Sequence, residues 1–308
     1  MSTNNRTGRK RDYVGVLSSV FAIVIGLLVG FVILLICNPS QALPGFVTIL
    51  TGAFTHGLKG VGQVFYYATP IILTGLSVGF AFKTGLFNIG TPGQFIVGAF
   101  AAVYVGIMWT GLGRIQWAVA LLAAILGGAL WGMVPGVLKA CFNVNEVIAS
   151  IMMNYIGMYM VNWIVKSYKP LFNNLRNESR NVAATAQIPK MGMDKLFPES
   201  SVGGGILLAV AAVLLIWVIL NKTTFGYELK AVGFNRDAGR YAGINEKRNI
   251  IMSMVIAGAI AGMAGGLLYL AGTGKHIEIK DVLAAEGFTG ISVALLGLSH
   301  PIGVLFSG

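Results

Sequence analysis

Charged residues are scarce in this 308-residue chain, at 11% of the sequence against 56% hydrophobic residues and a mean hydropathy of +0.76. This composition excludes an ordinary soluble globular domain. A membrane-spanning helix needs about 20 mostly apolar residues. Eight uncharged runs of that order recur, at Val14–Ile36, Gly62–Phe82, Thr84–Gly113, Ile115–Leu138, Val147–Val165, Val202–Asn221, Asn249–Gly274 and Gly287–Gly308. They predict an all-α, polytopic transmembrane bundle of about eight spans, because barrel strands would alternate in hydrophobicity.

Residues suited to disulfides and metals are also rare. The two cysteines, Cys37 and Cys141, lie at the ends of separate runs and fall on opposite sides of the membrane in the topology below. A disulfide framework is therefore not expected. The three histidines, His56, His276 and His300, stand far apart without a ligand spacing, so no metal site is predicted.

Motifs for catalysis and nucleotide binding are missing. Gly274-Lys275 lacks the upstream glycine and the following Ser or Thr of a phosphate loop. The Gly203–Gly205 triplet opens a run without a preceding strand, so it is not a dinucleotide fingerprint. No Ser-His-Asp or Cys-His set can be assembled with any specificity. We expect a chain that is not an enzyme and holds no cofactor of its own.

Acidic residues are the rarest charged class, with eleven in the whole chain and almost none inside a run. Transporters driven by protons or sodium usually carry ionisable groups at membrane depth. Glu146 and Glu286 stand at the edges of runs instead. This pattern argues against an ion-coupled secondary transporter, although polar side chains and backbone carbonyls can also bind sodium.

The formal charge of +11 does not indicate a nucleic-acid partner, because no basic patch sits on a polar domain. Lysines and arginines lie between the runs, as expected of residues that border membrane lipid. They divide almost evenly between the two sides, so the basic arm at residues 1–13 decides the orientation. A cytoplasmic arm places the 166–201 loop outside and the 222–249 loop inside.

Proline and glycine mark where helices break and where they pack. The segment 80–98, FAFKTGLFNIGTPGQFIVG, contains Pro92 and four glycines, which predicts a broken or re-entrant helix. Glycines at four-residue spacing predict closely packed helices; they are Gly26/Gly30, Gly75/Gly79, Gly128/Gly132/Gly136 and Gly258/Gly262/Gly266. Residues 14–308 are predicted to form one transmembrane domain. The chain ends inside an apolar run, from which we expect a truncated C-terminus.

A polar island interrupts the apolar chain at 231–249, AVGFNRDAGRYAGINEKRN. Asn235 can cap a helix, Asp237 suits the positive end of its dipole, and Gly243 can end it. This predicts a helix of about two turns, with a low-profile side formed by Ala238, Gly239 and Ala242. Such a helix is too short to be stable alone in water. It either solvates the membrane surface between two spans or fits into a groove on a partner.

The island, within TTFGYELKAVGFNRDAGRYAGINEKRNI, resembles the cytoplasmic coupling loop of permease subunits in bacterial ABC importers. The branch it is most similar to serves simple sugars and nucleosides together with extracytoplasmic binding proteins. GLFNIGTPGQFIVGAF (85–100) and NEVIASIMMNYIGMYMVNWIV (145–165) resemble other signature stretches of that branch, and the second is similar to the nucleoside permeases. The resemblance runs from about residue 65 to 308.

The resemblance implies a set of partners and a role for the island. ATP and Mg would be bound by separate ATP-binding subunits, a second permease subunit would complete the pathway, and a substrate-binding lipoprotein would deliver the cargo. The chain would lie in the bacterial inner membrane with a cytoplasmic N-terminus. The residues implied to couple it to the ATPase are Gly233, Asn235, Arg236, Asp237, Ala238, Gly239, Arg240, Tyr241 and Gly243. Gly239 replaces a commoner alanine, which softens the helix.

Four polar side chains on apolar spans are candidates for lining the pathway, namely Asn88, Gln94, Asn154 and Tyr155. Amides and phenols can hydrogen-bond ribose hydroxyls or base edges without the penalty of a buried charge. Alternatively they hold neighbouring helices together. Nucleoside transport, as opposed to transport of a simple sugar such as ribose, rests on the resemblance alone.

Overall fold

The computed structural model describes residues 7–308, with side chains from residue 17 onward, so the charges of the 1–13 arm lie outside the described part. In chain order the elements are α1 (Thr7–Cys37), α2 (Pro39–Thr55), α3 (Leu58–Phe82), α4 (Thr91–Met108), η1 (Thr110–Ile115), α5 (Gln116–Phe142), α6 (Glu146–Ser167), β1 (Phe172–Asn173), β2 (Glu178–Ser179), η2 (Ala184–Ala186), α7 (Met193–Leu196), α8 (Gly205–Lys222), α9 (Thr224–Phe234), α10 (Arg236–Tyr241), α11 (Glu246–Tyr269), α12 (Ala285–Leu296) and α13 (Pro301–Ser307). Seven described helices are long and apolar enough to cross a membrane, and α12 with α13 makes an eighth if the bent pair is one span. The predicted helical, polytopic architecture is confirmed.

The chain divides into two compact units, Met1–Val61 and Gly62–Gly308. In the first, the rings of Phe31 and Phe46 join α1 to α2 with their centroids 4.8 Å apart. Most described side chains of these helices are exposed and apolar, as expected of a surface that faces lipid. Helix α2 lies between the first two uncharged runs, where the sequence did not predict a helix. Pro39 stands in its first turn, where the backbone N–H that proline lacks would have no partner within the helix.

Glycines build the centre of the second unit, where α11 packs against α4 and α5. A Cβ added at Gly258 would collide with the carbonyl oxygen of Gly128, and one at Gly262 with that of Ala124. The backbones therefore touch, as the glycine spacing predicts. Gly30 on α1 has the same spacing, yet no atom lies within 4 Å of the place of its Cβ. The spacing marks a contact in the second unit only.

The last predicted run, Gly287–Gly308, contains the helix pair α12 and α13, bent by 118°. Leu298 and Ser299 adopt left-handed backbone conformations, with φ of 53° and 51°. Pro301 then opens α13, because its ring fits the first turn of a helix but not an interior. Apolar composition alone did not reveal the turn.

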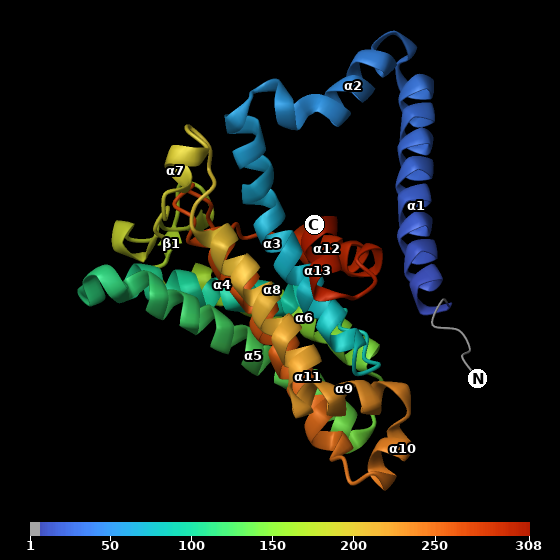
Figure 1. Cartoon of the computed structure of the whole chain (residues 1–308). Helices are drawn as coiled ribbons and strands as arrows, with labels where there is room; N and C mark the ends of the chain where they lie inside the picture. The colour runs from blue at the N-terminus through green and yellow to red at the C-terminus, as the bar shows by residue number, and fades with distance from the viewer. Residues whose placement is uncertain (1–6) are drawn as a thin grey trace. The chain divides into compact units, whose positions relative to one another are not determined.

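The predicted loops gather at opposite ends of the second unit (Figure 1). At one end the 166–201 loop forms the two-stranded sheet β1–β2, in which Phe172 pairs with Ser179, and carries α7. Backbone hydrogen bonds join this loop to the segment after α11, from Ser179 N to Ile277 O at 2.9 Å and from Ile188 N to Leu270 O at 2.8 Å. The helices α9 and α10 lie at the other end. This is the alternation of loops that the sequence predicts.

Candidate functional site

The link between α3 and α4 is irregular backbone that folds back into the bundle. After α3 ends at Phe82, the N–H of Leu86 donates to the carbonyl of Ala81 at 3.2 Å, and Leu86 and Asn88 are fully buried. Pro92 stands in the first turn of α4. The break predicted within 80–98 is therefore present. Buried protein surrounds it, which is the condition for irregular backbone at membrane depth.

An amide cluster fixes this link. The side chains of Asn88 and Gln94 exchange two hydrogen bonds of 2.9 and 3.1 Å, and Asn88 also donates to Ser77 Oγ at 3.3 Å. From α6, Asn154 Oδ1 accepts from the N–H of Gly93 at 2.9 Å, and its Nδ2 donates to the carbonyl of Ile89 at 2.9 Å. Asn154 thus caps the first turn of α4 from a neighbouring helix.

The cluster bears on the predicted pathway residues. Asn88, Gln94 and Asn154 are at most 1% exposed, and their amide groups are used by one another or by backbone. These contacts favour the packing alternative for the three amides. Tyr155, by contrast, is 47% exposed on the face of α6 that turns away from the bundle. A pathway role stays a prediction, and the geometry leaves it most room at Tyr155.

Replacing Asn154 with alanine is expected to lower the melting temperature of the purified protein. The change strands two buried backbone groups, at about 1–3 kcal/mol each. Tyr155→Phe is the neighbouring control, because it removes only an exposed hydroxyl and should leave the melting temperature unchanged. The measurement is thermal unfolding in detergent. An Asn154→Ala protein as stable as wild type would contradict the capping role.

The polar island forms a short helix with defined ends. Asn235 Oδ1 accepts from the N–H of Ala238 at 3.0 Å, which caps the start of α10 as predicted. At the other end Gly243 has a φ of +80° and donates to the carbonyl of Arg240 at 3.1 Å. The N–H of Ile244 donates to the carbonyl of Gly239 at 3.0 Å. This pair of bonds is a Schellman motif, in which glycine takes the left-handed position.

The helices α9 and α10 pack on the bundle through one glycine each. Gly239 is buried, and its nearest contact is Val232 of α9. It therefore faces the bundle, whereas the sequence suggested that its small side would face a partner protein. On α9, Gly233 lies against the carbonyl of Lys83 and close to Gly85, in the link that follows α3. Val232 itself belongs to a buried apolar cluster with Leu86 and Met254. Helix α10 therefore packs on α9, and α9 in turn packs against the link after α3 and against α11.

The outer side of this segment is aromatic and basic. Phe234 is 91% exposed and Tyr241 is 95% exposed, at the two ends of α10. Arg236 lies 4.0 Å from Glu246 of its own loop, whereas Arg240 has no ion pair among the described side chains. Sequence reasoning missed Phe234. Its signal was an apolar residue directly before a helix cap, in a polar segment with nothing to bury it.

A basic pocket lies beside this aromatic side. It has a volume of about 330 Å³ and is lined by Phe82, Lys83, Lys230, Gly233 and Phe234. Burial lowers the pKa of Lys83, and the nearby charge of Lys230 lowers it further. No carboxylate lines this pocket, so an acidic group from outside the chain would stabilise the charged form of its two lysines.

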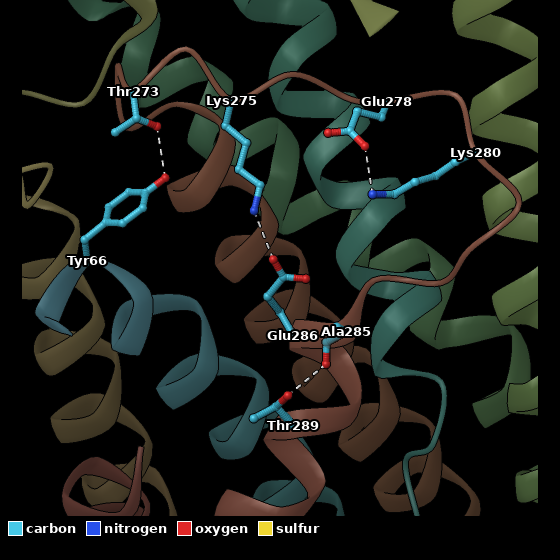
Figure 2. A network of polar contacts seen from close by, with 8 residues as sticks. All are labelled: Tyr66, Thr273, Lys275, Glu278, Lys280, Ala285, Glu286 and Thr289. Carbon is cyan, nitrogen blue, oxygen red and sulfur yellow. Dashed lines mark hydrogen bonds and ion pairs between the residues drawn. The ribbon is translucent and has the colours of Figure 1, made fainter. Parts of the chain in front are cut away.

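A second polar group lies at the opposite end, where the chain runs from α11 into α12 (Figure 2). Lys275 Nζ bonds Glu286 Oε1 at 3.0 Å, and Glu278 bonds Lys280 at 2.8 Å. The hydroxyl of Tyr66 lies 2.9 Å from that of Thr273. The two ion pairs border a pocket of about 240 Å³, which we call the outer pocket. It is lined by Ile96, Met158, Asn162, Tyr269, Lys275, His276, Glu278, Lys280, Val282, Leu283, Ala284, Ala285 and Glu286.

Sequence reasoning placed Glu286 at a run edge without giving it a role. The outer pocket draws its walls from α4, α6, α11 and the segment that leads into α12, so no single stretch of sequence encodes it. The one signal available was that Glu286 is among only eleven acidic residues in the chain.

Residues 60–308 match the family described as the permease component of the branched-chain amino acid transport system. The chain belongs to this permease family. The match begins close to residue 65, where the resemblance begins in the sequence. The permease is therefore a transport component.

Curated relatives resemble the permease over most of its length. The guanosine ABC transporter permease protein NupP of Bacillus subtilis is 41% identical over 94% of this chain and 81% of the relative. The nucleoside ABC transporter permease protein NupB of Lactococcus lactis is 35% identical over 99% and 82%. The glucose ABC transporter permease protein TsgB13 of Haloferax volcanii is 31% identical over 85% and 69%. No solved structure matches the permease.

Proposed function

We propose that this permease is a transmembrane subunit of an ATP-driven importer that translocates nucleosides. The observation that carries the proposal is the similarity to two permeases named for guanosine and nucleosides, at 41% and 35% identity over nearly the whole chain. The alternative, a simple sugar, is supported by the glucose permease at 31% identity over a smaller share. The nucleoside assignment has the stronger support.

The polar island at 231–249 is the contact for a separate ATP-binding subunit. That subunit binds ATP and Mg and hydrolyses the nucleotide. Exposed Phe234 and Tyr241 flank a short helix that the bundle holds from behind. Aromatic side chains of this kind serve as anchors in pockets of a partner. The positive pocket at Lys83 and Lys230 offers a place for an acidic side chain of the same partner. Closure of the ATPase pair would move α10, and through Gly233 the ends of α3 and α4.

The surfaces for the other two partners lie on the 166–201 loop and on α6. A binding lipoprotein would dock on the 166–201 loop and the 272–281 segment, which hydrogen bonds hold together. A second permease subunit would complete the pathway against the exposed face of α6, where Tyr155, Tyr159 and Trp163 stand at four-residue spacing. In this proposal α10 lies in the cytoplasm and the chain in the bacterial inner membrane. The basic residues of the 1–13 arm support a cytoplasmic N-terminus.

The proposal is tested by reconstitution of the importer in liposomes with its second permease, ATPase and binding protein. We expect guanosine uptake that requires both ATP and the binding protein, and that excess glucose or ribose does not reduce. The control is the permease alone under a proton or sodium gradient, which should take up nothing. Uptake driven by the ion gradient without an ATPase would contradict the ABC mechanism, and glucose uptake without guanosine uptake would contradict the substrate.

A further inference from the structure

We propose that the outer pocket is a nucleoside subsite of the permease itself, in which Glu286 accepts hydrogen bonds from the ribose hydroxyls. This inference rests on the proposed function. It adds a binding site on this chain, distinct from the binding protein that delivers the substrate. Three properties of the pocket carry it, namely its charge, its lining and the spare bonding capacity of its ion pair.

The pocket is polar but electrically balanced. Two lysines and two glutamates line it, and they form two ion pairs, Lys275 with Glu286 and Lys280 with Glu278. Their formal charges cancel, so the pocket has no excess of positive charge to bind a phosphate and no excess of negative charge to bind a metal ion. A neutral ligand that is rich in hydrogen-bonding groups fits this balance. Nucleosides are such ligands, whereas nucleotides are not.

The lining has two characters, as a nucleoside does. Ile96, Met158 and Leu283 supply apolar surface, and Tyr269 adds an aromatic ring. Lys275, Glu286 and Asn162 supply donors and acceptors. The apolar wall can pack against the flat base, and the polar groups can hydrogen-bond the ribose. A simple sugar would use only the polar groups. The pocket volume of about 240 Å³ is slightly smaller than the about 300 Å³ of the smallest typical ligand pockets. It therefore suits one compact ligand.

The ion pair keeps capacity for a ligand. Glu286 uses Oε1 to accept from Lys275, while Oε2 has no partner among the described residues. The Lys275 ammonium carries three N–H groups and makes one hydrogen bond here, and it also lies 5.9 Å from the centre of the Tyr269 ring. A carboxylate oxygen that faces a cavity accepts well from a hydroxyl pair, and the ammonium can donate to an acceptor on the ligand. Figure 2 shows both groups pointing into the space between the 273–280 segment and α12.

The location suits the first step of transport. The outer pocket lies at the end of the bundle opposite α10, and its rim is the segment on which we place the binding protein. A nucleoside released there meets the pocket before it reaches the buried part of the bundle. The site is expected to bind weakly, since tight binding at this step would hold the substrate back.

Photo-crosslinking with 8-azidoguanosine tests the subsite, with the assembled importer in nanodiscs and without binding protein. We expect labelled peptides from 158–162 or 269–286, and we expect excess guanosine to compete for the label. Glu286→Gln should lower the labelling about tenfold, since hydrogen bonds to a charged group are worth about 1.4 kcal/mol or more. The matched control is Glu146→Gln. It neutralises another carboxylate that is paired with a lysine, 2.9 Å from Lys139, at the other end of the bundle.

A second variant separates binding from structure. Ala285→Trp leaves the ion pair in place and fills the cavity, so it should also abolish the label while the melting temperature stays at the wild-type value. Labelling that both variants leave unchanged, or a label confined to other peptides, would overturn the subsite. Guanosine uptake by the same importer is measured in parallel. Uptake without a label in the pocket overturns this inference alone, whereas absence of uptake overturns the proposed function.

Discussion

Gly243→Val is expected to abolish guanosine uptake by the reconstituted importer while the protein still inserts into the membrane. Gly243 holds the left-handed position that ends α10, with a φ of +80°. That conformation costs an ordinary residue about 1–2 kcal/mol, and a β-branched side chain more. A six-residue helix has no stability of its own to offset this cost. The C-terminal turn therefore unwinds, and Tyr241 loses the position from which it would anchor the ATPase.

The measurements are ATP-driven uptake, stimulation of ATP hydrolysis by the loaded binding protein, and recovery of monodisperse complex. Gly243→Ala should give an intermediate loss, because alanine enters the left-handed region at lower cost than valine. Gly113→Val is the matched control. Gly113 also has a positive φ, of 55°, and open space around its Cβ position, but it lies at the opposite end of the bundle. Wild-type uptake by Gly243→Val would refute the coupling role of α10.

Gly258→Leu is expected to prevent the permease from folding. At this position the α11 backbone touches the carbonyl oxygen of Gly128 on α5, so a side chain can enter only if the two helices separate. Overpacking in a core already costs about 1–3 kcal/mol when side chains can adjust. Here the obstacle is backbone, which cannot move aside as a side chain can. The separation would also disturb Gly132, which lies against Met254 one turn away.

The yield of monodisperse protein in size-exclusion chromatography measures this effect. We expect it to fall about tenfold or more, since 1.4 kcal/mol of folding free energy is already tenfold. Gly30→Leu provides the control, because Gly30 belongs to a pair with the same four-residue spacing but has no atom within 4 Å of its Cβ position. Equal yields from the two variants would show that the glycine contact between α5 and α11 does not stabilise the bundle.

Local signals in the sequence predicted a large part of this molecule. Long uncharged runs gave the spans because the bilayer imposes a length on a helix wherever it occurs. Both ends of α10 were predicted from Asn235 and Gly243, since capping depends on residues within one turn of the helix end. The break before α4 followed in the same way from Pro92 and its neighbouring glycines. Each of these features depends on a few neighbouring residues.

Features that depend on distant residues were decided by the tertiary structure. Asn88, Gln94 and Asn154 were candidates for the pathway by residue type, but packing of α6 on α4 brings them together and uses their hydrogen bonds within the fold. The bend between α12 and α13 was hidden for a similar reason. It lies in an apolar run, and what distinguishes it from a straight span is the left-handed backbone at Leu298 and Ser299 and the packing of both helices on α3 at Gly75.

The sequence by itself determined the membrane architecture, the family and the limits of the coupling helix, because each is encoded by composition or by adjacent residues. The tertiary structure alone decided which glycines lie in helix contacts, which way Gly239 faces and which residues line the outer pocket. Ile96, Asn162, Tyr269 and Glu286 come from four parts of the chain, and only folding places them around one cavity. Each side chain's chemistry can be read from the sequence, but only helix packing brings the side chains of one site together.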